Sequence, residues 1–137
     1  MAQLSAIFTV WEATLRGYKD LRTYQLAYAL AMKIFNESKK FPREELYSLT
    51  DQIRRASRSV ASNIAEGFRK RRYRNMFISK LADSDAEAAE TQVFLDFARD
   101  CGYLQKEVHS SLTEDYEKLG RMLNKMIAKA DSFVPNH

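Results

Sequence analysis

The residues best suited to chemistry are basic and fall into two groups near the middle of the chain. The first group follows Gly67 and has five cations within six positions, interrupted only by Tyr73: Arg69, Lys70, Arg71, Arg72 and Arg74. Guanidinium groups bind phosphate oxygens in bidentate pairs, and an aromatic ring among them can stack on a base. The run therefore indicates binding of a nucleic acid or another polyanion.

The second basic group lies in the helix predicted before this run. At about 100° per residue, Arg54 and Arg58 fall on one side of that helix, and Arg55 lies further round. Residues 54–74 contain eight Lys or Arg and one acid, Glu66. Positive charge near a helix N-terminus is opposed by the helix dipole, so local stability does not explain the run. We therefore predict that both groups bind RNA or DNA.

Two other interpretations of these cations remain open. They can form a solvated face, in which Asp51 pairs with Arg55 four residues later. They can also contact acidic residues on a neighbouring subunit, because a later stretch is rich in carboxylates: Asp83, Asp85, Glu87, Glu90, Asp96 and Asp100. In that case the protein would be a structural or partner-binding oligomer with no nucleic-acid role.

Groupings typical of enzymes are missing from the sequence. The two histidines, His109 and His137, form no His-x-x-x-His or Glu-x-x-His pair. The single cysteine, Cys101, excludes an intrachain disulfide and a cysteine-rich zinc site. A glycine-rich phosphate-binding loop is also absent. We therefore expect a non-enzymatic protein with no catalytic residue, no metal site and no cofactor.

The elements that must position the cations are helices. Apolar positions recur at alternating steps of three and four, as in helices packed on helices, and Phe41-Pro42, Gly67 and Gly102 mark their ends. The predicted fold is all-α, an up-down antiparallel four-helix bundle. The buried stripe expected for residues 21–39 is Leu21, Tyr24, Tyr28, Ala31 and Phe35, and that for the helix ending near Gly67 is Leu46, Leu49, Ile53, Ala56, Val60, Asn63 and Gly67. For the third helix we expect Phe77, Leu81, Ser84, Ala88, Thr91, Leu95 and Ala98 to be buried. For residues 105–131 we expect Val108, Leu112, Leu119, Leu123, Met126 and Ala130, with Tyr116 at the edge of the stripe.

Side chains beside these stripes indicate further contacts between helices. Gln52, Ser59 and Asn63 form a polar stripe, which we expect to be hydrogen-bonded across a helix–helix contact because buried polar groups need partners. Phe94 and Phe97 fall outside the stripe of their own helix. In a monomer they would be partly exposed, which is typical of an interface.

The bundle is expected to span residues 20–132. An N-terminal extension, residues 1–19, precedes it and could form a short helix around Trp11, and residues 133–137 form a flexible tail. No apolar run approaches the roughly 20 residues of a membrane span, and no basic flank of a secretion signal precedes the first apolar residues. We therefore expect a cytoplasmic protein.

One long motif resembles a known family. The residues Gln52-Ile53-Arg54-Arg55-Ala56-x-x-Ser59-Val60-x-x-Asn63-Ile64-Ala65-Glu66-Gly67 are similar to the motif of the bacterial 23S rRNA intervening-sequence proteins. The resemblance extends to Phe41-Pro42, Glu45-Leu46-Tyr47 and Gly102-Tyr103-Leu104 and covers residues 20–130. It implies an up-down four-helix bundle that assembles into a ring-like homo-oligomer, a pentamer. It implies little about activity, and the nucleic-acid binding of related retroelement accessory proteins is an analogy only.

Overall fold

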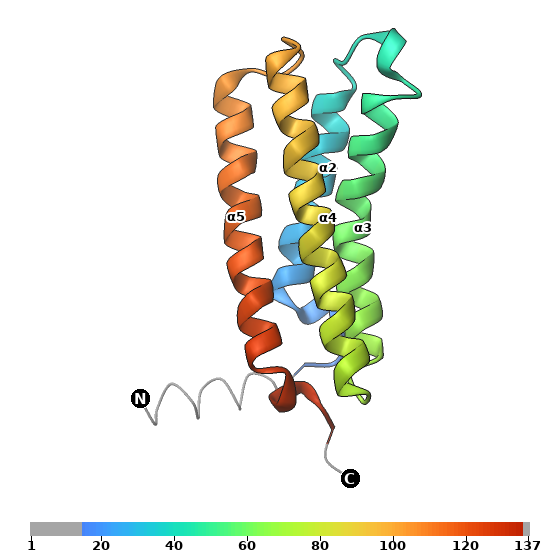
Figure 1. Cartoon of the computed structure of the whole chain (residues 1–137), viewed down its shortest axis with the longest axis vertical. Helices are drawn as coiled ribbons and strands as arrows, with labels where there is room; N and C mark the ends of the chain where they lie inside the picture. The colour runs from blue at the N-terminus through green and yellow to red at the C-terminus, as the bar shows by residue number, and fades with distance from the viewer. Residues whose placement is uncertain (1–14, 136–137) are drawn as a thin grey trace.

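The computed structural model describes residues 15–135, which form four long helices (Figure 1). These are α2 (Arg22–Ser38), α3 (Leu49–Arg69), α4 (Arg74–Asp100) and α5 (Lys106–Ala128). Three short 3-10 helices flank them: η1 (Tyr18–Asp20), η2 (Arg43–Glu45) and η3 (Ala130–Phe133). The described part of the chain contains no strand. The helix predicted around Trp11 lies outside the described residues.

Successive long helices run in opposite directions, as Figure 1 shows. The α3–α4 turn lies at the same end of the bundle as η1 and η3, and we call this end of the bundle the basic end. The α2–α3 and α4–α5 connections lie at the opposite end. Short connections place consecutive helices beside each other in antiparallel pairs. The predicted all-α, up-down four-helix bundle is therefore confirmed.

Packing, rather than capping, stabilises these helices. None of the N-cap side chains of the four long helices accepts a hydrogen bond from its first turn, so burial of apolar stripes must supply most of the stability. The prediction for α4 is confirmed at every position, because all of its expected inward residues are buried: Phe77, Leu81, Ser84, Ala88, Thr91, Leu95 and Ala98. Ser84 Oγ donates to the Val60 carbonyl oxygen of α3 at 2.7 Å, which satisfies this buried hydroxyl.

Leu21 is buried as predicted, but from there on the predicted core face of α2 is wrong by one position. The side chains that α2 buries are Thr23, Ala27, Leu30, Ile34 and Ser38. Of the expected stripe, Tyr24, Ala31 and Phe35 are half-buried and Tyr28 is 55% exposed. Because the buried face is shifted by one residue, the aromatic side chains of α2 lie at its boundary with α3 rather than in the core.

Gly67 does not end its helix, contrary to the prediction. It lies inside α3, which continues to Arg69. A Cβ atom at Gly67 would come within 3.0 Å of Lys80 Cβ on α4, so the glycine allows the two helices to approach closely. Gly102 does end α4, as predicted: its φ of 81° lies in the left-handed region that favours glycine.

The C-terminal part of the core also differs from the prediction. Helix α5 ends at Ala128, and η3 turns Phe133 into the core, where its ring lies 5.5 Å from that of Phe77. Phe133 is therefore not part of a flexible tail. Tyr116, expected at the edge of its stripe, is fully buried at 1% exposure. Leu46, expected in the stripe of α3, precedes that helix and is exposed.

Candidate nucleic-acid interface

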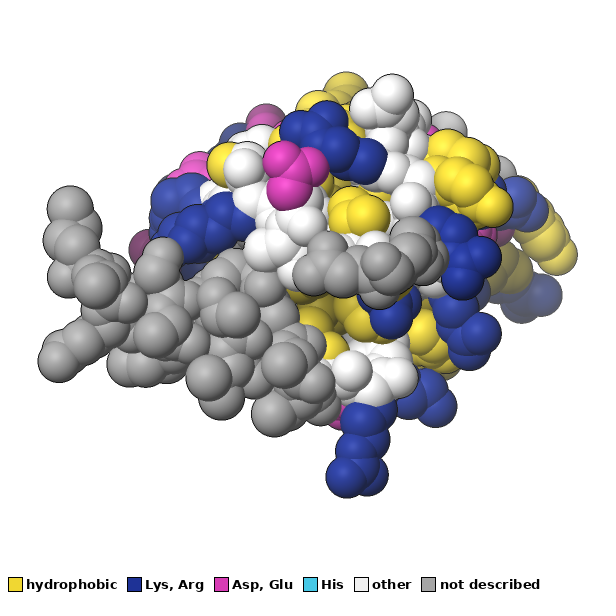
Figure 2. Space-filling view, turned by 90° about the horizontal axis from the view of Figure 1, so that it is seen from below, with side chains coloured by type: hydrophobic (Ala, Val, Ile, Leu, Met, Phe, Trp, Pro, Cys, Tyr) yellow, Lys and Arg dark blue, Asp and Glu magenta, His cyan; other side chains and the backbone are white. Residues whose placement is uncertain are grey.

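The strongest concentration of positive charge lies in the turn between α3 and α4. The five cations of the run occupy the last turn of α3, the connection and the first residue of α4. Seen from below, the basic end carries Lys and Arg side chains around its rim, next to hydrophobic side chains (Figure 2). The predicted cluster therefore lies on the surface at one end of the bundle.

Arg71 and Arg74 are held by the protein itself. Nη1 of Arg71 donates to the Phe68 carbonyl oxygen at 3.0 Å, and its guanidinium lies 4.0 Å from the centre of the Phe68 ring. Burial lowers the pKa of Arg71, and the nearby charge of Arg69 lowers it further. Arg74 Nε donates to Oδ1 of Asp131 in η3. Both arginines therefore help to fix the shape of the turn.

Arg72 and Tyr73 point into solvent. Both are exposed, Tyr73 to 60%, and within residues 15–135 Arg72 forms no ion pair. Tyr73 is the N-cap residue of α4, with extended backbone angles, so the turn presents its ring beside two arginines. An exposed ring between cations is able to stack on a base while the cations contact phosphate.

The acid closest to the run in sequence is engaged elsewhere. Nζ of Lys80 lies 2.9 Å from Oε2 of Glu66. The hydrogen bond from Lys80, followed by its charge, lowers the pKa of Glu66, which therefore stays ionised at neutral pH. Glu66 thus pairs with Lys80 on α4, and of the cations of the run it is Lys70 whose charge adds a smaller effect on its pKa. The positive charge of the turn is left largely uncompensated.

Two of the predicted cations of α3 face α2. Arg54 Nε donates to Ser38 Oγ at 2.8 Å, and the Arg54 guanidinium lies 4.8 Å from the centre of the Phe35 ring. The Arg58 guanidinium lies 5.9 Å from the same ring, and Lys39 Nζ lies 4.8 Å from it. A half-buried aromatic ring therefore collects three cations at the α2–α3 boundary.

Arg55 lies apart from Arg54 and Arg58. Its Nε is 3.0 Å from Oδ2 of Asp51, one helical turn earlier, so the predicted ion pair is present. Arg55 also lines an open groove of about 250 Å³ between α3 and α4, together with Gln52, Ala56, Ser59, Glu87, Glu90 and Phe94. Because this groove carries carboxylates, Arg55 does not extend the basic surface of the other cations.

The polar stripe of α3 was predicted to form hydrogen bonds across a helix–helix contact, but the hydrogen bonds described for it lie within α3. Nδ2 of Asn63 donates to the Ser59 carbonyl oxygen at 2.9 Å, within α3. Gln52 and Ser59 line the groove instead. On the α4 side, burial raises the pKa of Glu87, and the charge of Glu90 raises it further.

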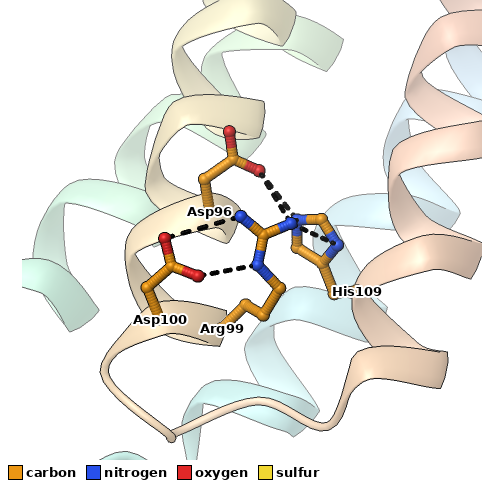
Figure 3. Close-up of polar contacts among 4 residues, drawn as sticks. All are labelled: Asp96, Arg99, Asp100 and His109. Carbon is orange, nitrogen blue, oxygen red and sulfur yellow. Dashed lines mark hydrogen bonds and ion pairs between the residues drawn. The ribbon is translucent and has the colours of Figure 1, made fainter.

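A charged cluster that the sequence analysis missed joins α4 to α5 (Figure 3). His109 is buried, and its Nε2 lies 2.7 Å from Oδ1 of Asp96. Arg99 Nη1 lies 3.3 Å from Nε2 of His109, and Arg99 Nε donates to Asp100 at 2.9 Å. This bond from Arg99 lowers the pKa of Asp100.

The spacing of this cluster carries a weak sequence signal. Asp96, Arg99 and Asp100 share one turn of α4, and His109 follows soon after the turn at Gly102. None of the contacts described for His109 brings a nucleophile to the ring, so the cluster acts as a clamp between the two helices. Within residues 15–135 no group of three or more His, Cys, Asp or Glu could hold a metal ion.

Comparisons with known proteins agree on the family. Residues 19–125 match the family described as 23S rRNA-intervening sequence protein. A crystal structure of a protein of unknown function from the S23 ribosomal protein family of Bacteroides thetaiotaomicron VPI-5482 is similar to this chain. The two are 25% identical, the TM-score is 0.69, and the match covers 77% of this chain and 95% of the other. A search of curated proteins gave no match.

None of the described helices is both long and apolar enough to cross a membrane. The family match covers most of the bundle and includes every predicted basic residue from Arg54 to Arg74. The chain belongs to the 23S rRNA-intervening sequence protein family.

Proposed function

We propose that this protein is a non-enzymatic nucleic-acid-binding module that works as a homo-oligomer in the cytoplasm. The basic end holds the phosphate backbone, with Arg69, Lys70 and Arg72 as the main contacts. Arg71 and Arg74 shape the turn and add charge to it. Because phosphate contacts carry no base information, binding depends on charge rather than on sequence.

The observation that carries this proposal is the crowding of cations without matching carboxylates. Among the described residues, only Arg74 of the five cations in the run forms an ion pair. Arg71 is pressed against Phe68, where burial lowers its pKa and the positive charge of Arg69 lowers it further. Like charges held together destabilise a fold, so the arrangement is explained best by an anion that binds there.

A charge-matched pair of variants tests this proposal. The test variant, K70A/R72A, removes one lysine and one arginine from the basic end. The control, R43A/K106A, removes one of each from the opposite end, where both residues are exposed. Binding of fluorescein-labelled RNA and DNA is measured by anisotropy across a salt series, with light scattering to show that the variants keep the wild-type mass.

We expect K70A/R72A to weaken binding and to reduce the slope of log K against log salt by roughly 1.5, since each lost phosphate contact removes about 0.7 to 0.9. The control should follow wild type. If both double variants lose the same affinity, the effect is one of net charge, and the basic end is not the binding surface.

The oligomer itself is part of the proposal. The family resemblance implies a pentamer, and the exposed apolar side chains of α4 supply a surface for self-association. Val93 and Phe97, one helical turn apart, are 50% and 58% exposed. A monomer gains little from exposing such a ridge, which is typical of an interface. Light scattering of the wild-type protein gives the number of subunits.

The same ridge favours a second candidate function. A structural or partner-binding oligomer would use the ridge and the carboxylates near it for protein contacts and would have no nucleic-acid role. This function predicts that neither RNA nor DNA binds at low salt, and that V93S or F97S reduces the mass of the particle. Because both functions use the ridge for the oligomer, the anisotropy measurement is the one that separates them.

A further inference from the structure

A line of aromatic and arginine side chains follows the boundary between α2 and α3. We call it the aromatic–arginine strip, and its members are Tyr18 of η1, Tyr24, Tyr28 and Phe35 of α2, and Arg54, Arg58 and Arg69 of α3. The sequence pattern placed the α2 members in the core. The structure leaves Tyr28 exposed and Tyr24 and Phe35 half-buried.

The α2 side of the strip begins with three neighbouring tyrosine rings, and Phe35 follows two helical turns after Tyr28. The centroids of Tyr18 and Tyr24 are 4.9 Å apart in an edge-to-face arrangement, and those of Tyr24 and Tyr28 are 6.1 Å apart. Burial raises the pKa of Tyr24, and its two tyrosine neighbours raise it further. The Tyr24 hydroxyl therefore stays neutral at physiological pH.

The α3 side of the strip places a cation near each end of this row. The Arg69 guanidinium lies 6.0 Å from the centre of the Tyr18 ring, while Arg54 and Arg58 lie over Phe35. Helix geometry explains the alignment, because Arg58 and Arg69 are separated by eleven residues, which is a rotation of only about 20° beyond whole turns and a rise of about 16 Å.

The strip is open to a ligand and carries one sign of charge. Tyr28 is 55% exposed, and Arg58 and Arg69 are exposed as well. Within residues 15–135 neither arginine forms an ion pair with a carboxylate. A row of rings flanked by unpaired guanidinium groups is complementary to a chain that alternates anionic groups with flat aromatic ones.

We propose that the aromatic–arginine strip binds a single-stranded stretch of nucleic acid lengthwise. The arginines contact phosphates at intervals along the strand, and an unpaired base stacks on the exposed tyrosine ring. Arg54 and Arg69 lie about 22 Å apart along α3, a length over which a stacked strand places about six phosphates. A duplex cannot use the strip in this way, because its bases are already stacked inside the helix. This inference rests on the proposed function and adds a preference for unpaired strands.

The first test uses an aromatic variant that leaves the net charge unchanged. Tyr28→Ala removes the exposed ring, and Tyr28→Trp keeps a stacking surface. The probes are a labelled 12-nucleotide oligouridine and a labelled 12-base-pair RNA duplex. We expect wild type to bind the single strand more tightly, Y28A to lose about tenfold in affinity for it, and Y28W to retain it. The affinity for the duplex and its salt slope should be the same in all three proteins.

The second test changes charge and uses an independent position. Arg58→Ala should weaken single-strand binding, whereas Arg121→Ala removes an exposed arginine from α5 and should have no effect. Circular dichroism melts and light scattering show whether each variant keeps its fold and mass. If R58A or Y28A instead reduces the mass of the particle, the strip is a contact between subunits and the inference is overturned.

The failures of the two proposals are distinguishable. If the duplex binds as tightly as the single strand, or if Y28A binds the single strand as wild type does, the strip is not a binding surface for unpaired bases. In that case the loss caused by K70A/R72A still supports the proposed function. If neither probe binds at low salt, both proposals are wrong.

Discussion

The arginines of this protein differ in role because they differ in what their guanidinium groups contact. Arg55 is neutralised by Asp51 one turn earlier, Arg71 rests on Phe68, and Arg74 pairs with Asp131 from the other end of the described chain. Arg72 has no such partner among the described residues and is exposed. An arginine without an internal partner retains its full capacity to bind a phosphate.

At the residue scale, the groove between α3 and α4 gives a prediction about pH. The pKa of Glu87 is raised by burial and by Glu90, so the folded state favours the protonated form. A raised carboxylate pKa stabilises the fold below the unfolded value of 4.5 and loses that contribution as the pH rises through the folded pKa. Glu87→Gln should therefore increase the free energy of unfolding at pH 7 by roughly 0.5 kcal/mol, the size of a surface like-charge pair.

Urea unfolding from pH 4 to pH 8 measures this effect. The gain from E87Q should shrink towards zero below pH 4.5, where Glu87 is protonated in both states. Glu114→Gln on α5 serves as a control because Glu114 is exposed. A gain from E87Q that stays constant across this range would show that ionisation of Glu87 is not its source.

At the element scale, regular helix patterns predicted the fold better than they predicted every core face. The α4 stripe was correct at each position, although α4 also carries apolar side chains outside it, such as Val93 and Phe97. In α2 two stripes compete, one aromatic and one of smaller residues such as Ala27 and Leu30. Small side chains let α2 approach its neighbours closely, and large rings can remain half-exposed, so hydrophobicity alone selected the wrong face.

Buried polar residues explain why the apolar pattern predicted the wrong core face for α2. Thr23 and Ser38 are buried at its two ends, and each hydroxyl finds a partner that the sequence does not reveal. Thr23 Oγ1 donates to Met126 Sδ at 3.3 Å on α5, and Ser38 Oγ accepts from Arg54 of α3. A buried hydroxyl is tolerated when such a partner exists, and these partners become known only when the helices are assembled.

The close approach of α3 and α4 at Gly67 yields a prediction at the same scale. Gly67→Ala would gain about 1 kcal/mol of helix propensity, but its new Cβ would lie 3.0 Å from Lys80 Cβ. Because that atom is fixed to the α4 backbone, the helices must separate, at a cost of about 1–3 kcal/mol. We expect a net destabilisation of roughly 1 kcal/mol from overpacking.

Gly120 provides the matched control, since it also lies inside a long helix. A Cβ atom there would meet only the Oδ1 of Asp85, at 3.3 Å, the end of a side chain that can move. Gly120→Ala should therefore stabilise the protein by up to about 1 kcal/mol. Thermal unfolding of both variants measures these changes in stability. Equal stabilisation by G67A and G120A would contradict a tight α3–α4 contact at Gly67.

At the scale of the whole molecule, the packing of the helices decides which residues share a surface. The basic run could be predicted because its cations are adjacent in the sequence. The aromatic–arginine strip could not, because it joins residues 18–35 with residues 54–69 and depends on how far α2 is rotated about its axis. The clamp of Asp96, Arg99 and His109 likewise needed the fold to bring the start of α5 against the end of α4.

The bundle also places the basic run and the α4–α5 turn at opposite ends of the molecule. The basic end carries the run and the first members of the strip, while the opposite end carries the α4–α5 turn with Asp100 and its neighbours. A strand bound to the run can continue along α2 and α3 without meeting the carboxylates near Asp96. Both proposals therefore describe one continuous path for a nucleic acid.

The measurement that tests this account most directly is the equilibrium binding of wild-type protein to labelled single-stranded RNA over a series of KCl concentrations. If about four to five cations contact phosphates, log K should fall linearly with log salt with a slope of about −3, at 0.7 per contact. Absence of binding at the lowest salt concentration, or an affinity that does not change with salt, would contradict the account and leave the oligomer as a scaffold for protein partners.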